Sequence, residues 1–148
     1  MAAVFNHLGH CVTDLARSRR FYEELFDFKF LREINPPDDP SNKLLRLKNP
    51  MDMTALYLQR DGLVLELLHY AGEGAKALPA RERVMNEPGL THISVSVDVD
   101  DICARIGDYG GEVLEDTNIG FGCFVRDPDG QLIELLPMSY RDSLEGDH

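Results

Sequence analysis

The sequence predicts an α+β fold in which one strand-helix-strand-strand-strand unit is used twice. The first observation is a repeated octapeptide: residues 61–68 (DGLVLELL) recur 68 positions later as residues 129–136 (DGQLIELL). The second is a pair of histidines, His7 and His92, each a few residues before an aspartate that can open a helix. The third is the order of the elements between these markers, which is the same in both halves.

Length and composition are those of one globular domain spanning 148 residues. A net charge of −11 opposes binding to nucleic acid or to anionic membranes. No apolar run approaches the ~18 residues of a membrane span, and residues 1–6 lack a basic signal region, so a cytoplasmic protein is expected. Cys11, Cys103 and Cys123 are odd in number and widely spaced, which predicts reduced thiols in small core positions.

The first module, residues 1–71, is predicted to begin with a strand and a helix that Asp14 caps. Residues 35–52 contain four prolines and should be a long irregular connection, with 43–47 as a candidate short element. An Asp61-Gly62 turn then joins two strands as a hairpin. The regular elements are expected at 4–13 (strand), 15–26 (helix), 27–33 (strand), 54–59 and 63–69 (strands).

Residues 72–89 form a linker by composition, with a helical turn expected at 80–85. The second module, residues 90–138, repeats the element order of the first. Asp100 is predicted to cap its helix, and Gly110-Gly111 ends that helix. The acidic tail, residues 139–148, is expected to be frayed. The strands are expected at 90–98, 112–116, 122–126 and 132–136, with a helix from Asp100 to Tyr109.

Glu66 and Glu134 are unusual because each sits in the middle of an apolar strand. Such a carboxylate needs a cation, a proton or strong hydrogen-bond donors. Each half also places one histidine on its first strand, and His92 shares its polar face with Ser94. Two imidazoles and two carboxylates make a mixed set suited to one divalent ion, Zn, Ni, Co, Mn or Fe. His10 and His69 have no counterpart in the other half, so structural roles are expected for both.

These residues resemble the vicinal oxygen chelate superfamily, which includes glyoxalase I, methylmalonyl-CoA epimerase, extradiol dioxygenases and bleomycin or fosfomycin resistance proteins. The similarity rests on the His7 segment continuing to Phe21-Tyr22, on Leu65-Glu66-Leu67, on the His92 segment, and on the stretch from Phe124 to Leu135. It implies paired βαβββ modules that form a cupped, mostly antiparallel sheet around a metal held by His7, Glu66, His92 and Glu134. It also implies a small-molecule substrate with vicinal oxygens and a homodimer.

The resemblance is strongest to glyoxalase I, and it implies a lyase or isomerase that moves a proton next to a carbonyl through a metal-stabilised enediolate. Glu134 is then the principal base, and Glu66 can share that role. Glyoxalase I typically has arginine at the position of Cys11 and asparagine at that of Tyr70, so Cys11 and Tyr70 are predicted to line the substrate site and to disfavour glutathione. Ser94 is also predicted to line the substrate site.

Three alternatives differ in how they use the ligand set. Methylmalonyl-CoA epimerase usually has glutamine at the position of Glu66. Extradiol ring-cleaving dioxygenases use two histidines and one glutamate on Fe(II), which leaves Glu66 without a role. Antibiotic-binding members keep the fold without catalysis, and many lack the metal set. The epimerase-like and dioxygenase-like readings are therefore second to glyoxalase I, and a small-molecule or antibiotic binder is third.

Overall fold

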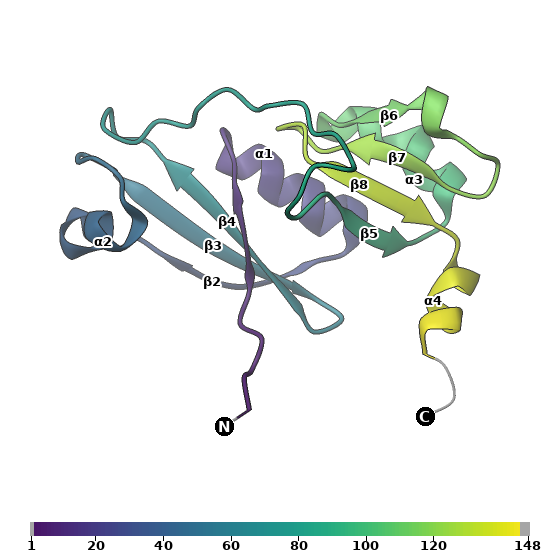
Figure 1. The fold of residues 1–148 in the computed structure, drawn as a ribbon, viewed down its shortest axis with the longest axis horizontal. Coiled ribbons are helices and arrows are strands. Elements are labelled where there is room, and N and C mark those ends of the chain that lie inside the picture. The colour runs from purple at the N-terminus through teal and green to yellow at the C-terminus, as the bar shows by residue number, and fades with distance from the viewer. Residues whose placement is uncertain (1, 146–148) are drawn as a thin grey trace. The chain divides into compact units, whose positions relative to one another are not determined.

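The computed structural model describes residues 2–145 and divides into two compact units, Met1–Pro79 and Ala80–His148 (Figure 1). The boundary falls inside the segment predicted to be a linker, residues 72–89. Each unit contains one four-stranded mixed sheet with helices. The predicted α+β class and its two similar modules are thus confirmed.

The first unit has the strand order β1-β4-β3-β2, in which β1 and β4 are parallel and the other pairs are antiparallel. The first helix continues into a π-helical turn, η1, whose Phe21 and Tyr22 are buried. The elements are β1 (Leu8–Cys11), α1 (Leu15–Arg20), η1 (Phe21–Leu25), β2 (Lys29–Ile34), α2 (Asp38–Leu45), β3 (Met53–Arg60) and β4 (Leu63–Tyr70).

The second unit repeats this topology with the strand order β5-β8-β7-β6, again with a parallel first pair. Its first helix continues into a 3₁₀ turn, as the first helix of the other unit continues into a π turn. The elements are β5 (Ile93–Ser96), α3 (Val99–Arg105), η2 (Ile106–Tyr109), β6 (Glu112–Leu114), η3 (Glu115–Thr117), β7 (Cys123–Arg126), β8 (Leu132–Leu136) and α4 (Met138–Leu144).

Side chains along β4 and β8 alternate between two faces of each sheet. One face is buried in the core, and the other, called the site face, carries Glu66 in the first unit and Glu134 in the second. Leu65 and Leu67 are at most 1% exposed, and Ile133 and Leu135 occupy the same positions in the second unit. In the first unit α1 packs against β4. In the second, α3 lies against β7 through Cys103 and Cys123. The glutamate in the middle of each strand therefore points to the opposite side from the two buried residues that flank it.

Two predicted irregular regions contain helices instead. Helix α2 occupies part of residues 35–52, because Asp38 accepts hydrogen bonds from the backbone of Met51 and Asp52, both at 3.2 Å, and Leu45 packs on a cluster around Met51. Helix α4 forms where a frayed tail was expected. Residues 146–148 of that tail lie outside the described part of the chain.

Several predicted boundaries were also wrong. Asp98, not Asp100, caps α3, because its side chain accepts from Asp101 N at 3.1 Å. Residues 80–84 contain no helical turn. Both first strands are shorter than predicted, so His7 and His92 each lie immediately before a strand rather than within it. Within residues 2–145, none of the helices combines the length and apolarity needed to cross a membrane.

Candidate metal centre

In the first unit, the fold brings His7 and Glu66 together. Gly9 pairs with Glu66 in the parallel β1–β4 register, which places His7 beside the middle of β4. His7 Nε2 lies 3.3 Å from Glu66 Oε1. Glu66 is 8% exposed, and it is one of three buried polar or charged residues in the described chain. The carboxylate predicted to be sheltered is therefore both sheltered and paired with the predicted histidine.

The second unit builds the corresponding pair from His92 and Glu134. Ser94 pairs with Glu134 in the parallel β5–β8 register, as Gly9 pairs with Glu66. His92 Nε2 lies 3.8 Å from Glu134 Oε1, and the Glu134 side chain is 30% exposed. The Glu134 side chain is therefore more exposed than that of Glu66, which is 11% exposed.

Both histidines are oriented by the residue that precedes them. His7 Nδ1 hydrogen-bonds with Asn6 Oδ1, and His92 Nδ1 lies 2.8 Å from Thr91 Oγ1. When Nδ1 carries the proton and donates a hydrogen bond to these oxygens, Nε2 carries a lone pair that can bind a metal. Histidine ligands in metal sites are commonly held in this way, with the second ring nitrogen donating to an oxygen.

An aromatic ring lies edge-on to each histidine, from the strand next to the glutamate. The ring centroids are 5.6 Å apart for His7 and Tyr57, and 5.2 Å apart for His92 and Phe124. Tyr57 faces Glu66 in the β3–β4 register, and Phe124 faces Glu134 in the β7–β8 register. The aromatic position is thus duplicated along with the ligand pair.

The two carboxylates have different hydrogen-bond donors. Tyr57 donates its hydroxyl to Glu66 Oε2. Glu134 accepts instead from Ser94 Oγ, at 2.9 Å to Oε1. Burial, followed by the hydrogen bond and the charge of Glu66, raises the pKa of Tyr57 to about 12. The phenol therefore stays protonated and remains a donor at neutral pH.

The geometry of each pair fits two ligands of one divalent ion. Ligand atoms about 2.0–2.2 Å from a metal lie roughly 3–3.5 Å from each other, close to the 3.3 and 3.8 Å found here. Each unit supplies one nitrogen and one oxygen, the donor types predicted. Among residues 2–145 no group of three or more His, Cys, Asp or Glu side chains gathers as a metal site.

The other predicted site residues fall on the site face. Cys11 and Tyr70 flank the Glu66 position, because Cys11 pairs with Leu68 and Tyr70 is two residues farther along β4. Burial, then the nearby Cys11 and Glu66, raises the pKa of Tyr70. Ser94 donates to Glu134, as described above. His10 lies edge-on to Tyr22, with ring centroids 6.1 Å apart, in agreement with a structural role.

Four further residues contact the pairs and were not predicted from the sequence: Asn6, Tyr57, Thr91 and Phe124. Asn6 and Thr91 directly precede the two histidines, so the repeat itself contained that signal. Tyr57 and Phe124 lie nine and ten residues before their glutamates, because the two hairpins have different pairing registers. A comparison of the two halves at equal sequence spacing therefore does not align Tyr57 with Phe124.

A cavity of about 200 Å³ borders Glu134 in the second unit. Aromatic and aliphatic side chains form most of its wall, and Ile119, Phe121 and Tyr140 are also exposed to solvent. Phe121 and Tyr140 contact each other, with ring centroids 6.3 Å apart. The lining residues are Thr117, Ile119, Phe121, Gly122, Cys123, Phe124, Glu134, Leu136 and Tyr140.

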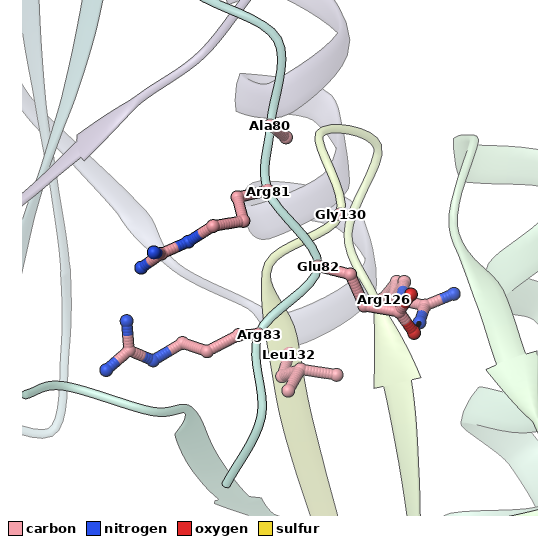
Figure 2. Close-up of a pocket in the computed structure, with 7 residues that line it drawn as sticks. All are labelled: Ala80, Arg81, Glu82, Arg83, Arg126, Gly130 and Leu132. Atoms are coloured by element: carbon pink, nitrogen blue, oxygen red, sulfur yellow. Dashed lines mark hydrogen bonds and ion pairs between the residues drawn. The ribbon is translucent and has the colours of Figure 1, made fainter. Parts of the chain in front are cut away.

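A second cavity of about 210 Å³, also in the second unit, contains three arginines. Figure 2 shows Arg81 and Arg83 on one side of an extended stretch, while Glu82 points toward Arg126. Arg126 pairs with Glu82 at 3.1 Å and with Glu112 at 2.8 Å. Arg81 pairs with Glu87, and Arg83 donates to backbone carbonyls. Carboxylates compensate the charges of Arg81 and Arg126, whereas Arg83 has backbone carbonyls as its acceptors.

The fold and its two His/Glu pairs define a protein made of duplicated βαβββ modules with a candidate ligand pair in each. The model of the Glyoxalase/Bleomycin resistance protein/Dioxygenase superfamily matches residues 4–135, and the chain belongs to that superfamily.

Two curated relatives are lactoylglutathione lyases. The Schizosaccharomyces pombe enzyme is 29% identical over 143 residues, covering 90% of this chain and 47% of its own length. The Arabidopsis thaliana enzyme GLX1 is 26% identical over 138 residues, covering 89% and 43%. The chain thus spans about half the length of the curated relatives it matches.

Solved structures support the same fold. The trypanothione-dependent glyoxalase I of Leishmania major is 26% identical, with a TM-score of 0.67 over 97% of this chain and 93% of that one. The fosfomycin resistance protein FosX of Listeria monocytogenes, solved with Mn(II) and sulfate, is 19% identical, with a TM-score of 0.64 over 97% and 99%. At that identity the second likeness concerns the fold alone.

Proposed function

We propose that the chain is a divalent-metal-dependent lyase or isomerase, similar to glyoxalase I, with His7, Glu66, His92 and Glu134 as the metal ligands. The observation that carries the proposal is the duplicated His/Glu pair. Each pair sits at the same register of a parallel strand pair, with its nitrogen and oxygen 3.3 or 3.8 Å apart. The proposal assigns all four residues to one ion and the chain to a homodimer.

The proposed reaction moves a proton between adjacent carbons of a substrate that carries vicinal oxygens. When bound, a divalent metal would stabilise the negative charge that develops on those oxygens. Glu134 takes the proton from carbon and returns it to the neighbouring carbon. Its Oε1 accepts from Ser94, and within residues 2–145 its Oε2 has no hydrogen-bond or ion-pair partner. That free oxygen is available to accept a proton.

The cavity beside Glu134 supports a substrate with a small apolar group next to the reacting carbons. Its wall of Ile119, Phe121, Phe124 and Leu136 would exclude water from one side of the carboxylate.

The test begins with the metal content of protein purified without chelator, followed by assays on three substrate classes. Hemithioacetals of 2-oxoaldehydes are expected to react with retention of all substrate atoms. Racemisation of a branched thioester would instead identify an epimerase, and oxygen uptake on a catechol would identify a ring-cleaving dioxygenase. Protein that binds no divalent metal, or that binds a small molecule without turnover, would contradict the proposal.

A further inference from the structure

The two ligand pairs differ at the side chain that faces the glutamate from the antiparallel neighbour. Tyr57 occupies that position opposite Glu66, and Phe124 occupies it opposite Glu134. Both rings lie edge-on to the histidine of their own unit, at 5.6 and 5.2 Å. A single hydroxyl therefore distinguishes the two aromatic positions.

The hydroxyl of Tyr57 determines what the two oxygens of Glu66 can do. Oε2 accepts the hydrogen bond from Tyr57, while Oε1 is the oxygen that lies 3.3 Å from His7 Nε2. Each oxygen has its own partner, and the side chain is only 11% exposed. Rotating or withdrawing this carboxylate would leave buried polar atoms without partners, which is costly.

Glu134 is held at one oxygen. Ser94 Oγ donates to Oε1, and the same Oε1 is the atom closest to His92 Nε2. Phe124 has no hydroxyl to offer Oε2, and no other described residue bonds to it. The side chain is 30% exposed and borders the apolar cavity. Glu134 can therefore move Oε2 without breaking a hydrogen bond.

The serine of the second unit also has a distinct counterpart in the first. Gly9 pairs with Glu66 at the position where Ser94 pairs with Glu134, so β1 offers no hydroxyl there. The donor thus comes from the antiparallel neighbour β3 in the first unit and from the parallel neighbour β5 in the second. The two glutamates therefore occupy equivalent positions but accept their hydrogen bonds from strands on opposite sides.

We propose that Tyr57 is a positioning residue that makes Glu66 the fixed ligand and so leaves Glu134 as the carboxylate that moves. This inference rests on the proposed function, because both glutamates must serve one metal for the difference to matter. The Tyr57 hydroxyl would then explain why Glu66 and Glu134 have unequal roles although they occupy matching sequence positions.

The test exchanges the hydroxyl between the two positions. Tyr57→Phe removes one oxygen atom, and Phe124→Tyr introduces one opposite Glu134. Zn²⁺ affinity is measured by competition with a chromophoric chelator, and the visible spectrum of the Co²⁺-loaded protein reports the ligand arrangement. Turnover of the substrate identified in the panel is measured at full metal occupancy. Tyr109→Phe, which removes a hydroxyl bonded to Arg105, is the matched control.

Tyr57→Phe is expected to weaken metal binding about 10- to 100-fold and to alter the Co²⁺ spectrum. Its melting temperature should fall by a few degrees, because one buried carboxylate oxygen loses its donor, but the variant should still fold. Phe124→Tyr should lower kcat without weakening metal binding. In the variant that carries both exchanges, Glu66→Gln should become more damaging to kcat than Glu134→Gln.

Two results separate failure of this inference from failure of the proposed function. A parent protein that binds metal and turns substrate over, beside a Tyr57→Phe variant with unchanged affinity and spectrum, overturns the role of Tyr57 alone. A parent protein that binds no divalent metal overturns both. If Phe124→Tyr does not fold, Tyr57→Phe and its Tyr109→Phe control still decide the question.

Discussion

Ser94 donates a 2.9 Å hydrogen bond to Glu134 Oε1, the same oxygen that lies 3.8 Å from His92 Nε2. Both contacts thus fall on one oxygen of the carboxylate. The Glu134 side chain also borders a cavity whose wall is formed mostly by aromatic and aliphatic side chains. This arrangement distinguishes Glu134 from Glu66, whose two oxygens have separate partners, and it leads to the first prediction.

Glu134→Gln should lower kcat by about 10²- to 10⁴-fold at matched metal occupancy, because an amide can still ligate but cannot accept the proton. Glu66→Gln should cost less in kcat, since it removes a ligand charge rather than the base. The measurements are steady-state turnover and solvent deuterium exchange at the substrate carbon. Equal losses in the two variants, or undiminished exchange in Glu134→Gln, would refute Glu134 as the principal base.

One divalent ion should bind per set of His7, Glu66, His92 and Glu134. His7→Ala and His92→Ala should each weaken binding strongly, because each leaves a carboxylate without its nitrogen partner. His10→Ala is the control, since that imidazole packs on Tyr22. Metal content by plasma spectrometry, together with the oligomeric state by light scattering, checks this. Full metal loading in both ligand variants would contradict the assignment.

Cys11 and Tyr70 should disfavour glutathione conjugates. They flank Glu66 on the site face, where a glyoxalase I would typically place arginine and asparagine. Turnover of the methylglyoxal–glutathione hemithioacetal should therefore be slow compared with that of smaller thiol adducts. Cys11→Arg combined with Tyr70→Asn should lower its KM. Robust turnover of the glutathione adduct by the parent chain would show that the two residues do not exclude it.

Asp127 should be important for stability rather than for chemistry. It is 3% exposed, and its Oδ1 accepts from Asp129 N at 2.9 Å and from Gln131 N at 2.8 Å. Asp127→Ala leaves both donors without that acceptor and should lower the free energy of unfolding by about 1–3 kcal/mol. Urea unfolding measures this. Asp116→Ala, at an exposed position, should stay within about 0.5 kcal/mol of the parent.

Cys103 should react slowly with alkylating agents at neutral pH. Burial and the contact with Cys123, whose sulfur lies 3.6 Å away, raise the pKa of Cys103 to about 12. A raised pKa lowers the thiolate fraction at pH 8, so the rate should still increase about tenfold per pH unit up to pH 10. Pulsed iodoacetamide labelling with mass spectrometry compares it with the exposed Cys11. A plateau near pH 9 would contradict the prediction.

The sequence by itself determined the elements whose signals are local. The Asp-Gly turn and the alternating apolar run fix β4 and β8, because turn chemistry and side-chain alternation depend on neighbouring residues. The same repetition identified His7, Glu66, His92 and Glu134 without knowledge of which strands pair. The prediction from sequence was wrong at α2, where the proline content indicated an irregular segment. Contacts from Asp38 to the backbone near Met51 stabilise the helix instead.

The tertiary structure alone decided which side chain faces each glutamate. That choice depends on the register between antiparallel strands, and the paired residues are nine apart in the first hairpin and ten apart in the second. The equivalence of Tyr57 and Phe124 could therefore not be predicted from the sequence. The same holds for the role of the hydroxyl group by which the two side chains differ. A hydrogen bond depends on the distance between atoms in space, and strand pairing sets that distance for residues that are far apart in sequence.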